Sequence, residues 1–168
     1  QKAIELKESK GYTFVHPFDD ENVIAGQGTI ALEVLSELDD IDAIVVPIGG
    51  GGLISGIAYT AKQIRPSVKV YGVQVAGAPS MYNSIKSGEI KCLKSVSTIA
   101  DGIAVKKPGD NTYELVKEYV DEIAIVSDDE VSSAILALME KQKMIAEGAG
   151  AAAVAAVMFD KFKLKGKR

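Results

Sequence analysis

The stretch Val45–Ala58, VVPIGGGGLISGIA, sets the architecture expected for the whole chain. Four consecutive glycines, Gly49–Gly52, follow an apolar run over residues 43–48 that is typical of a strand buried on both faces. After the glycines, apolar residues recur at helical spacing over residues 53–64. We therefore predict a strand, a glycine loop and a helix, with the loop lying where the chain leaves the sheet.

The alternation of strands and helices continues on both sides of this unit. Apolar and β-rich runs predict strands over residues 12–15, 69–76 and 122–127. Helical spacing predicts helices over residues 3–10, 29–38, 80–87, 111–120 and 128–143, and an alanine-rich helix after residue 147. Crossovers between parallel strands are right-handed and place helices on both faces of the sheet. The predicted fold class is α/β, a three-layer sandwich with a mainly parallel sheet.

Local signals mark where some of these elements begin. Thr29 is the expected cap of the helix over residues 29–38. Ser127 and Glu130 have the spacing of a capping box at the start of the helix over residues 128–143. The stretch before Thr29, HPFDDENVIAGQG, holds a proline and two glycines and is predicted to be a loop.

Composition and charge restrict the class of protein. The 168 residues are 47% hydrophobic and 25% charged, and the net charge of −4 gives no basic footprint for nucleic acid. No apolar run approaches the roughly 20 residues of a membrane helix, so no membrane partner is expected. The single cysteine, Cys92, excludes an internal disulfide and favours a reducing, cytoplasmic location. We expect Cys92 to be a small buried filler rather than a nucleophile, and the lysine-rich end of the chain to be solvated.

The glycine loop has the features of a phosphate cradle. It lies between a strand and a helix N-terminus, where unpaired N–H groups attract anions, and glycines let an anion approach them. A Walker loop would end in Gly-Lys-Ser/Thr, but Leu53 and Ile54 follow the glycines here. A dinucleotide site would place an acid on the next strand, which offers Gln74 instead. A single phosphate monoester therefore fits better, and a tight, closely packed turn is the alternative reading.

The chain resembles the serine/threonine dehydratase family of fold-type II enzymes, which depend on pyridoxal 5′-phosphate. The resemblance rests on several motifs that occur in the same order. They are HPFDDENVIAGQGTIALEVL, VPIGGGGLISGIA, IADG and EGAGAAA, which together cover nearly the whole chain. The resemblance implies that Gly49–Gly52 and Leu53 hold the cofactor phosphate. It also implies that Gly102 lies beside the pyridine ring and that Glu147 lies near the edge of the ring. The residues of GQGT are implied to be scaffolding near the site. The cofactor-binding residues that the resemblance implies are therefore Gly49, Gly50, Gly51, Gly52, Leu53, Gly102 and Glu147.

The resemblance also implies a division of the chain and a missing group. The family's cofactor lysine lies in a Ser-x-Lys-x-Arg-like motif, which does not occur in these residues, so no catalytic residue is expected in this chain. Residues 1–11 then correspond to the last helix of a small domain. Residues 12–168 correspond to the later part of the large, cofactor-binding domain. We accordingly expect the sequence to be a piece of a longer enzyme.

The implied reaction is the dehydration and deamination of L-threonine to 2-oxobutanoate and ammonia, with L-serine to pyruvate as a further reaction. Serine dehydratase, serine racemase and a cysteine-synthase-like replacement are alternative chemistries, and a non-catalytic phosphate-binding module is an alternative of another class. Family members are expected to act on a small amino acid and to form dimers or tetramers of one chain.

No metal site is expected. The racemase-like cation site needs acids in the stretch QVAGAPS, which has none. His16 is read as a packing or loop residue, and Asp19, Asp20 and Glu21 are read as solvated acids.

Overall fold

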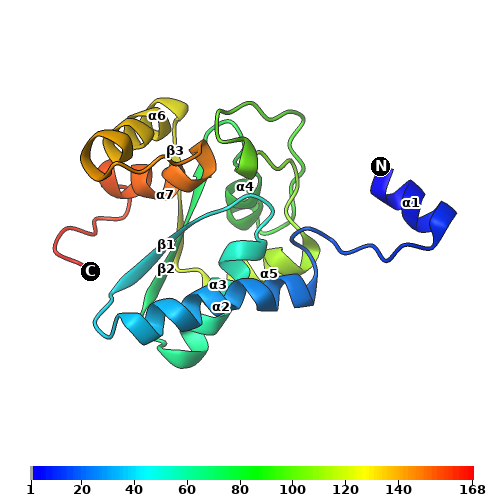
Figure 1. The fold of residues 1–168 in the computed structure, drawn as a ribbon, viewed down its shortest axis with the longest axis horizontal. Helices are drawn as coiled ribbons and strands as arrows, with labels where there is room; N and C mark the ends of the chain where they lie inside the picture. Colours follow the sequence, from blue (N-terminus) through cyan, green and yellow to red (C-terminus); the bar gives the residue numbers. More distant parts are fainter. Residues whose placement is uncertain (1) are drawn as a thin grey trace.

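A computed structural model describes residues 2–168. Three strands, β1 (Ala43–Pro47), β2 (Lys69–Val75) and β3 (Glu122–Val126), form a parallel sheet in the order β1-β2-β3 (Figure 1). In the register, Val45 lies beside Tyr71, and Val73 lies beside Ala124. The carboxyl ends of the three strands therefore meet at one edge, where ligands bind in open α/β sheets.

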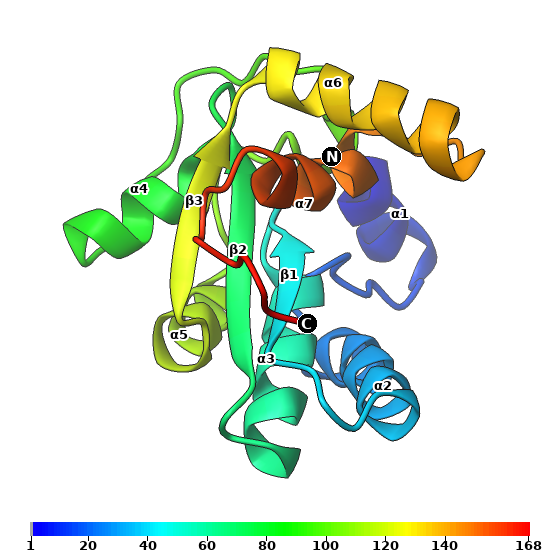
Figure 2. The same ribbon diagram turned by 90° about the vertical axis from the view of Figure 1, so that its left-hand side faces the viewer.

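Helices cover both faces of this sheet, as predicted (Figure 2). One face packs against α2 (Glu21–Glu37), α3 (Gly52–Ile64), α4 (Ser80–Ser87) and α5 (Asp110–Tyr119). The other face packs against α6 (Asp128–Ala137) and α7 (Gly148–Met158). On β2, Val70 points to the first core while Val73 points to the second, as the alternation of side chains along a strand requires.

Two short elements interrupt the regular pattern. A single 3-10 turn spans Asp101–Ile103, just before the loop that leads to α5. The predicted helix over residues 128–143 is α-helical to Ala137 and then widens into a π turn, Leu138–Gln142, which ends at Lys143 with φ of 59°. The capping box of Ser127 and Glu130 forms as the sequence predicts.

The prediction for α2 was wrong at its start. The helix begins at Glu21 rather than Thr29, because the Asp20 carboxylate caps it by accepting hydrogen bonds from the N–H groups of Asn22 and Val23. The two glycines of this stretch do not break the helix. A Cβ on Gly28 would lie 2.5 Å from the Thr60 hydroxyl of α3, so this glycine serves the close crossing of α2 and α3.

The predicted strand over residues 12–15 was also wrong. These residues form no regular structure and carry exposed side chains on the segment between α1 (Lys2–Lys10) and α2. A strand needs a neighbouring strand for its backbone groups, and none lies beside this segment among the described residues. Figure 1 shows α1 apart from the rest of the molecule, and none of its residues is buried. The assignment of residues 1–11 to a small domain stays a prediction.

One smaller expectation was wrong. Cys92 is exposed rather than buried, because it lies in the irregular segment that runs over the surface between α4 and the 3-10 turn. Lys163, Lys165, Lys167 and Arg168 are exposed, as expected, although this end of the chain also contacts the rest of the molecule. Lys161 pairs with Glu130 at 2.7 Å, and the carbonyl of Arg168 accepts hydrogen bonds from the N–H groups of Asp42 and Ala43.

None of the helices in residues 2–168 is both long and apolar enough to span a membrane.

Candidate functional site

A cavity of about 500 Å³ opens at the carboxyl end of β1, between the glycine loop and the first turn of α7. It brings together all the residues that the sequence predicts to hold the cofactor: Gly49, Gly50, Gly51, Gly52, Leu53, Gly102 and Glu147. These residues come from three separate parts of the chain, so the fold makes one site of them. Their role in binding stays a prediction.

The glycine loop leaves a row of hydrogen-bond donors free. The N–H groups of residues 49–54 donate to no acceptor within residues 2–168, and the first bond of the helix runs from the Ser55 N–H to the Gly51 carbonyl. Gly51, the N-cap of α3, has φ of 102° and provides no side chain to cap the helix. Unpaired N–H groups at a helix start carry partial positive charge and are able to attract an anion.

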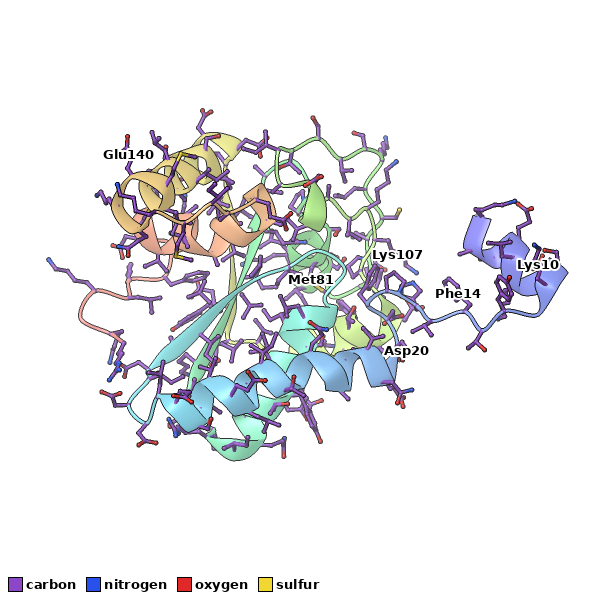
Figure 3. The ribbon with its side chains drawn as sticks, in the orientation of Figure 1. Lys10, Phe14, Asp20, Met81, Lys107 and Glu140 are labelled. Atoms are coloured by element: carbon purple, nitrogen blue, oxygen red, sulfur yellow. The ribbon has the colours of Figure 1, made fainter. Side chains whose placement is uncertain are left out.

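The glycines also serve close packing, which was the alternative reading of the loop. A Cβ on Gly50 would lie 2.4 Å from the Phe18 ring. One on Gly51 would lie 2.8 Å from Met81 Cε and 2.8 Å from Thr112 Cβ. Figure 3 shows Met81 in the interior of the molecule. The loop is therefore both an open row of donors and a tightly packed turn.

A second open helix start faces the same cavity. Glu147 is the N-cap of α7 but makes no capping hydrogen bond with its side chain, and the first residues of the helix, Ala149 and Gly150, line the cavity. The Glu147 carboxylate instead lies beside Gly102, where a Cβ would be 3.3 Å from Oε1. Two helix dipoles thus end at one cavity with their positive ends.

The helices α2, α4, α5 and α6 have side-chain acceptors at their starts. Asp20 caps α2 (Figure 3), and Ser127 caps α6. The Gln74 amide oxygen accepts from the Tyr82 N–H in α4, and the Asp19 carboxylate accepts from three N–H groups of α5. Among α2–α7, the two helices without such an acceptor are the two whose first residues line the cavity.

The donors of the site suit a phosphate group. No lysine or arginine among the described residues lines the cavity, and Glu147 is the ionisable residue there. An anion would therefore be held by backbone N–H groups, which reach it directly because no Cβ covers them. The fit of a phosphate to this loop rests on that open row of donors.

Several residues considered in the sequence have structural roles instead. Gln74 is fully buried and donates from Nε2 to the Ile48 carbonyl at 3.1 Å, so it cannot reach a ribose. His16 accepts from the Asp19 N–H at 2.8 Å and packs edge-on to Phe18, as expected for a loop residue.

The acids that follow His16 are not simply solvated, which corrects the prediction for two of them. Asp19 binds the start of α5, and Asp20 caps α2. Glu21 is exposed in the first turn of α2. Among residues 2–168, no group of three or more histidine, cysteine or acidic side chains is placed to hold a metal ion.

Part of the cavity wall was not predicted. Phe18, Val23 and Gln27 come from the segment that the sequence analysis took for a loop, and Ile103 and Val105 follow the predicted Gly102. Gln27 had a partial signal, because the resemblance placed GQGT near the site. The others are ordinary apolar residues, whose position depends on the packing of distant segments.

Comparison with known proteins places the chain in a family. The sequence model of the family described as "Pyridoxal-phosphate dependent enzyme" matches residues 1–168. L-threonine ammonia-lyase of Thermotoga maritima is 52% identical over 168 residues, which are 100% of this chain and 42% of that protein. The catabolic L-threonine dehydratase TdcB of Escherichia coli K12 is 48% identical over 95% of this chain and 49% of its own length. The chain thus spans less than half the length of these curated relatives.

Solved structures agree with this assignment. Maize serine racemase superposes with a TM-score of 0.92 at 39% identity, covering 95% of this chain and 50% of that one. The processed form of threonine deaminase isoform 2 from Solanum lycopersicum gives 0.92 at 42% identity, covering 98% and 46%. The open glycine loop, the fold and the sequence lead to one conclusion: the chain belongs to the family of pyridoxal-phosphate dependent enzymes.

Proposed function

We propose that the enzyme containing these residues converts L-threonine to 2-oxobutanoate and ammonia, and that this chain holds the cofactor phosphate. The observation that carries the proposal is the open donor row of residues 49–54 in a chain 52% identical to an L-threonine ammonia-lyase. The reaction balances, since the water lost from the β-carbon is taken up again when ammonia is released.

The residues of this chain bind and orient. The N–H groups of the loop Gly49–Gly52 and of Leu53 hold the phosphate at the end of β1, where the dipole of α3 adds to the attraction. Gly102 would lie against the face of the cofactor ring, and the Glu147 carboxylate, which lies beside Gly102, would lie near its edge. When bound, pyridoxal phosphate supplies an electron sink for the charge left by removal of the substrate α-proton.

The apolar side of the cavity limits access of water. Phe18, Ile103 and Val105 line it, and the Phe18 ring lies directly against Gly50. Electrostatic interactions are stronger where water is excluded, so these side chains increase the hold of the backbone donors on a phosphate.

We further propose that a lysine outside residues 1–168 carries the cofactor and moves the α-proton. The support is that the Ser-x-Lys-x-Arg-like motif is absent from this sequence. Lys62 does not replace it, because its ammonium pairs with Asp121 at 2.7 Å and donates to the Val68 carbonyl, and it does not line the cavity. On this proposal the chain alone binds pyridoxal phosphate but does not turn over threonine.

The experiment separates binding from turnover. The purified chain is titrated with pyridoxal 5′-phosphate and with pyridoxal, and then incubated with L-threonine while 2-oxobutanoate is measured. We expect binding that requires the phosphate, with no sustained product. Sustained 2-oxobutanoate would contradict the placement of the lysine, and equal affinity for the two compounds would contradict the phosphate site.

Substrate preference is tested with the complete enzyme. We expect 2-oxobutanoate from L-threonine at a higher kcat/KM than pyruvate from L-serine. D-serine formed from L-serine as the main product would favour the racemase alternative. The structural likeness to maize serine racemase is the reason to test for it. A cytoplasmic location and a homo-oligomeric assembly remain parts of this proposal, supported by the single cysteine and by the family resemblance.

A further inference from the structure

The glycine loop is tied from behind to the start of α5. The carbonyl of Gly50 accepts a hydrogen bond from the Thr112 hydroxyl at 2.6 Å and another from the Gly109 N–H at 3.3 Å. Thr112 is fully buried, and its own carbonyl lies 3.4 Å from the Ser55 hydroxyl of α3. The two helix starts are thus joined through one peptide group of the loop.

A held carbonyl fixes the direction of the next N–H. In a trans peptide the C=O of Gly50 and the N–H of Gly51 point in opposite directions, and no peptide bond within residues 2–168 is cis. Because the carbonyl points to Thr112 and Gly109, the N–H of Gly51 points away from α5. Gly51 lines the cavity, whereas Thr112 and Gly109 do not. The bond from Thr112 therefore keeps this N–H turned from the α5 side.

Asp19 holds Thr112 in place for this bond. Its carboxylate accepts from the N–H groups of Asp110 at 2.9 Å, Asn111 at 3.0 Å and Thr112 at 3.1 Å. It lies so close to Gly109 that a Cβ there would be 2.3 Å from it. This carboxylate also fills the start of α5, the helix end beside the loop, which would otherwise offer an anion a competing set of donors.

We propose that Thr112, supported by Asp19, is a positioning residue that orients the Gly50–Gly51 peptide for phosphate binding. This inference rests on the proposed function, since it assumes that the loop holds a phosphate. Neither residue touches the phosphate, and both act through the backbone of the loop. The contribution is preorganisation, because a peptide already turned toward its ligand loses less freedom on binding.

The test compares two substitutions of Thr112. One keeps nearly the volume of the side chain, and the other keeps its hydroxyl. Thr112→Val removes the hydroxyl, and Thr112→Ser keeps it. Inorganic phosphate and pyridoxal 5′-phosphate are titrated into the 168-residue chain, and the Gly51 amide signal is followed by nitrogen–proton correlation spectra. We expect about fivefold to tenfold weaker binding for Thr112→Val, as for the loss of one hydrogen bond, and wild-type affinity within about twofold for Thr112→Ser.

Ser127→Ala is the matched control for a loss of stability alone. It removes a capping hydroxyl from α6, whose residues do not line the cavity. We expect it to lower the melting temperature without changing phosphate affinity. Asp19→Asn provides a second variant, expected to weaken phosphate binding in the same direction as Thr112→Val.

The outcomes distinguish this inference from the proposed function. Wild-type affinity in a folded Thr112→Val would overturn the positioning role, and Asp19→Asn at wild-type affinity would overturn it if Thr112→Val does not fold. An equal loss of affinity in Ser127→Ala would also overturn it. If the wild-type chain binds neither phosphate nor pyridoxal phosphate, the proposed function fails at its first step.

Discussion

The starts of α3 and α5 lie side by side, but within the part of the chain that the structure describes only the start of α5 has a side-chain acceptor for its N–H groups. At α5, the Asp19 carboxylate accepts three N–H hydrogen bonds, and at α3 the corresponding N–H groups have no acceptor among the described residues. The Gly109 N–H and the Thr112 hydroxyl both donate to the Gly50 carbonyl and so connect the two helix starts. One helix end is thus neutralised by a side chain of the protein, and the neighbouring end has no such partner among residues 2–168.

The difference shows how structural and functional helix starts can be told apart. An uncapped start costs stability, because buried polar groups need partners. Here that cost falls on α3 and α7, both of which open into one cavity, while α2, α4, α5 and α6 have side-chain acceptors. The concentration of open ends at a single place is the feature that favours a ligand there.

The largest effect is expected where the open end tolerates no side chain. Gly51→Ala must adopt a left-handed backbone and place its Cβ 2.8 Å from Met81 and Thr112. We expect the free energy of unfolding to fall by about 2–4 kcal/mol, with loss of phosphate binding. Urea unfolding measures the first and titration the second.

Gly26→Ala is the control for this substitution. Gly26 lies within α2, and a Cβ there would have open space. We expect unchanged or slightly increased stability, by up to about 1 kcal/mol. If both alanine variants behaved alike, the glycine loop would not be the constrained turn described above.

A charge placed at the second open end should repel the ligand without disturbing the fold. Gly150 lines the cavity in the first turn of α7, and a Cβ there would meet nothing within 4 Å. We expect Gly150→Asp to weaken phosphate binding by at least about tenfold through charge repulsion. Gly26→Asp adds the same charge away from the cavity and should leave the affinity unchanged, while equal effects would mean that net charge, not the cavity, governs binding.

The residue pattern predicted the glycine loop, and the family resemblance added Gly102 and Glu147, but most of the apolar wall of the cavity was missed. The glycine loop could be found because strand, loop and helix follow one another along the chain. The start of α2 was missed because Gly26 and Gly28 were taken as helix breakers. In the structure Gly28 allows α2 to cross α3 closely, and no local rule reveals that contact.

The packing residues were missed for the same physical reason. Phe18 lies against Gly50 although the two residues are far apart along the chain. Asp19 was taken for a solvated acid because its partners in α5 are 91 to 93 residues away. The predicted strand over residues 12–15 failed because composition alone does not supply a neighbouring strand.

Removing the cap of α5 should cost less than forcing a side chain into the loop. Asp19→Ala leaves three N–H groups of α5 without their acceptor, and we expect a loss of about 1–2 kcal/mol in the free energy of unfolding. Urea unfolding measures the loss. A variant as stable as the wild type would show that α5 does not depend on this carboxylate. It would contradict the claim that α5, unlike α3, is stabilised by a side-chain cap.

The smallest expected effect is a pH dependence at the capped start of α6. Burial of Glu130 raises the pKa of its carboxyl, but the hydrogen bonds from Lys161 and from the Ser127 N–H outweigh burial and hold the pKa below its ordinary value. A carboxyl with a lowered folded pKa contributes stability above its unfolded pKa and loses it as the pH falls through the folded one. We expect stability to decline below about pH 4, and Glu130→Gln to flatten that decline.

Chemical unfolding between pH 7 and pH 3 checks this expectation. Phosphate affinity between pH 4 and pH 5, where inorganic phosphate keeps one charge, should be the same in Glu130→Gln and the wild type, because Glu130 does not line the cavity. An identical pH profile of stability in the two proteins would show that Glu130 does not cause the loss of stability at low pH.

The most direct test of the open helix start is a nitrogen–proton correlation titration of the labelled chain. Pyridoxal 5′-phosphate, inorganic phosphate and pyridoxal are each added while the amide signals of residues 49–54 and 110–112 are followed. We predict large shifts in residues 49–54 with the two phosphate compounds, little change in residues 110–112, and no comparable shift with pyridoxal. Shifts that centre on residues 110–112, or that pyridoxal reproduces at residues 49–54, would contradict the assignment of the glycine loop as the phosphate site.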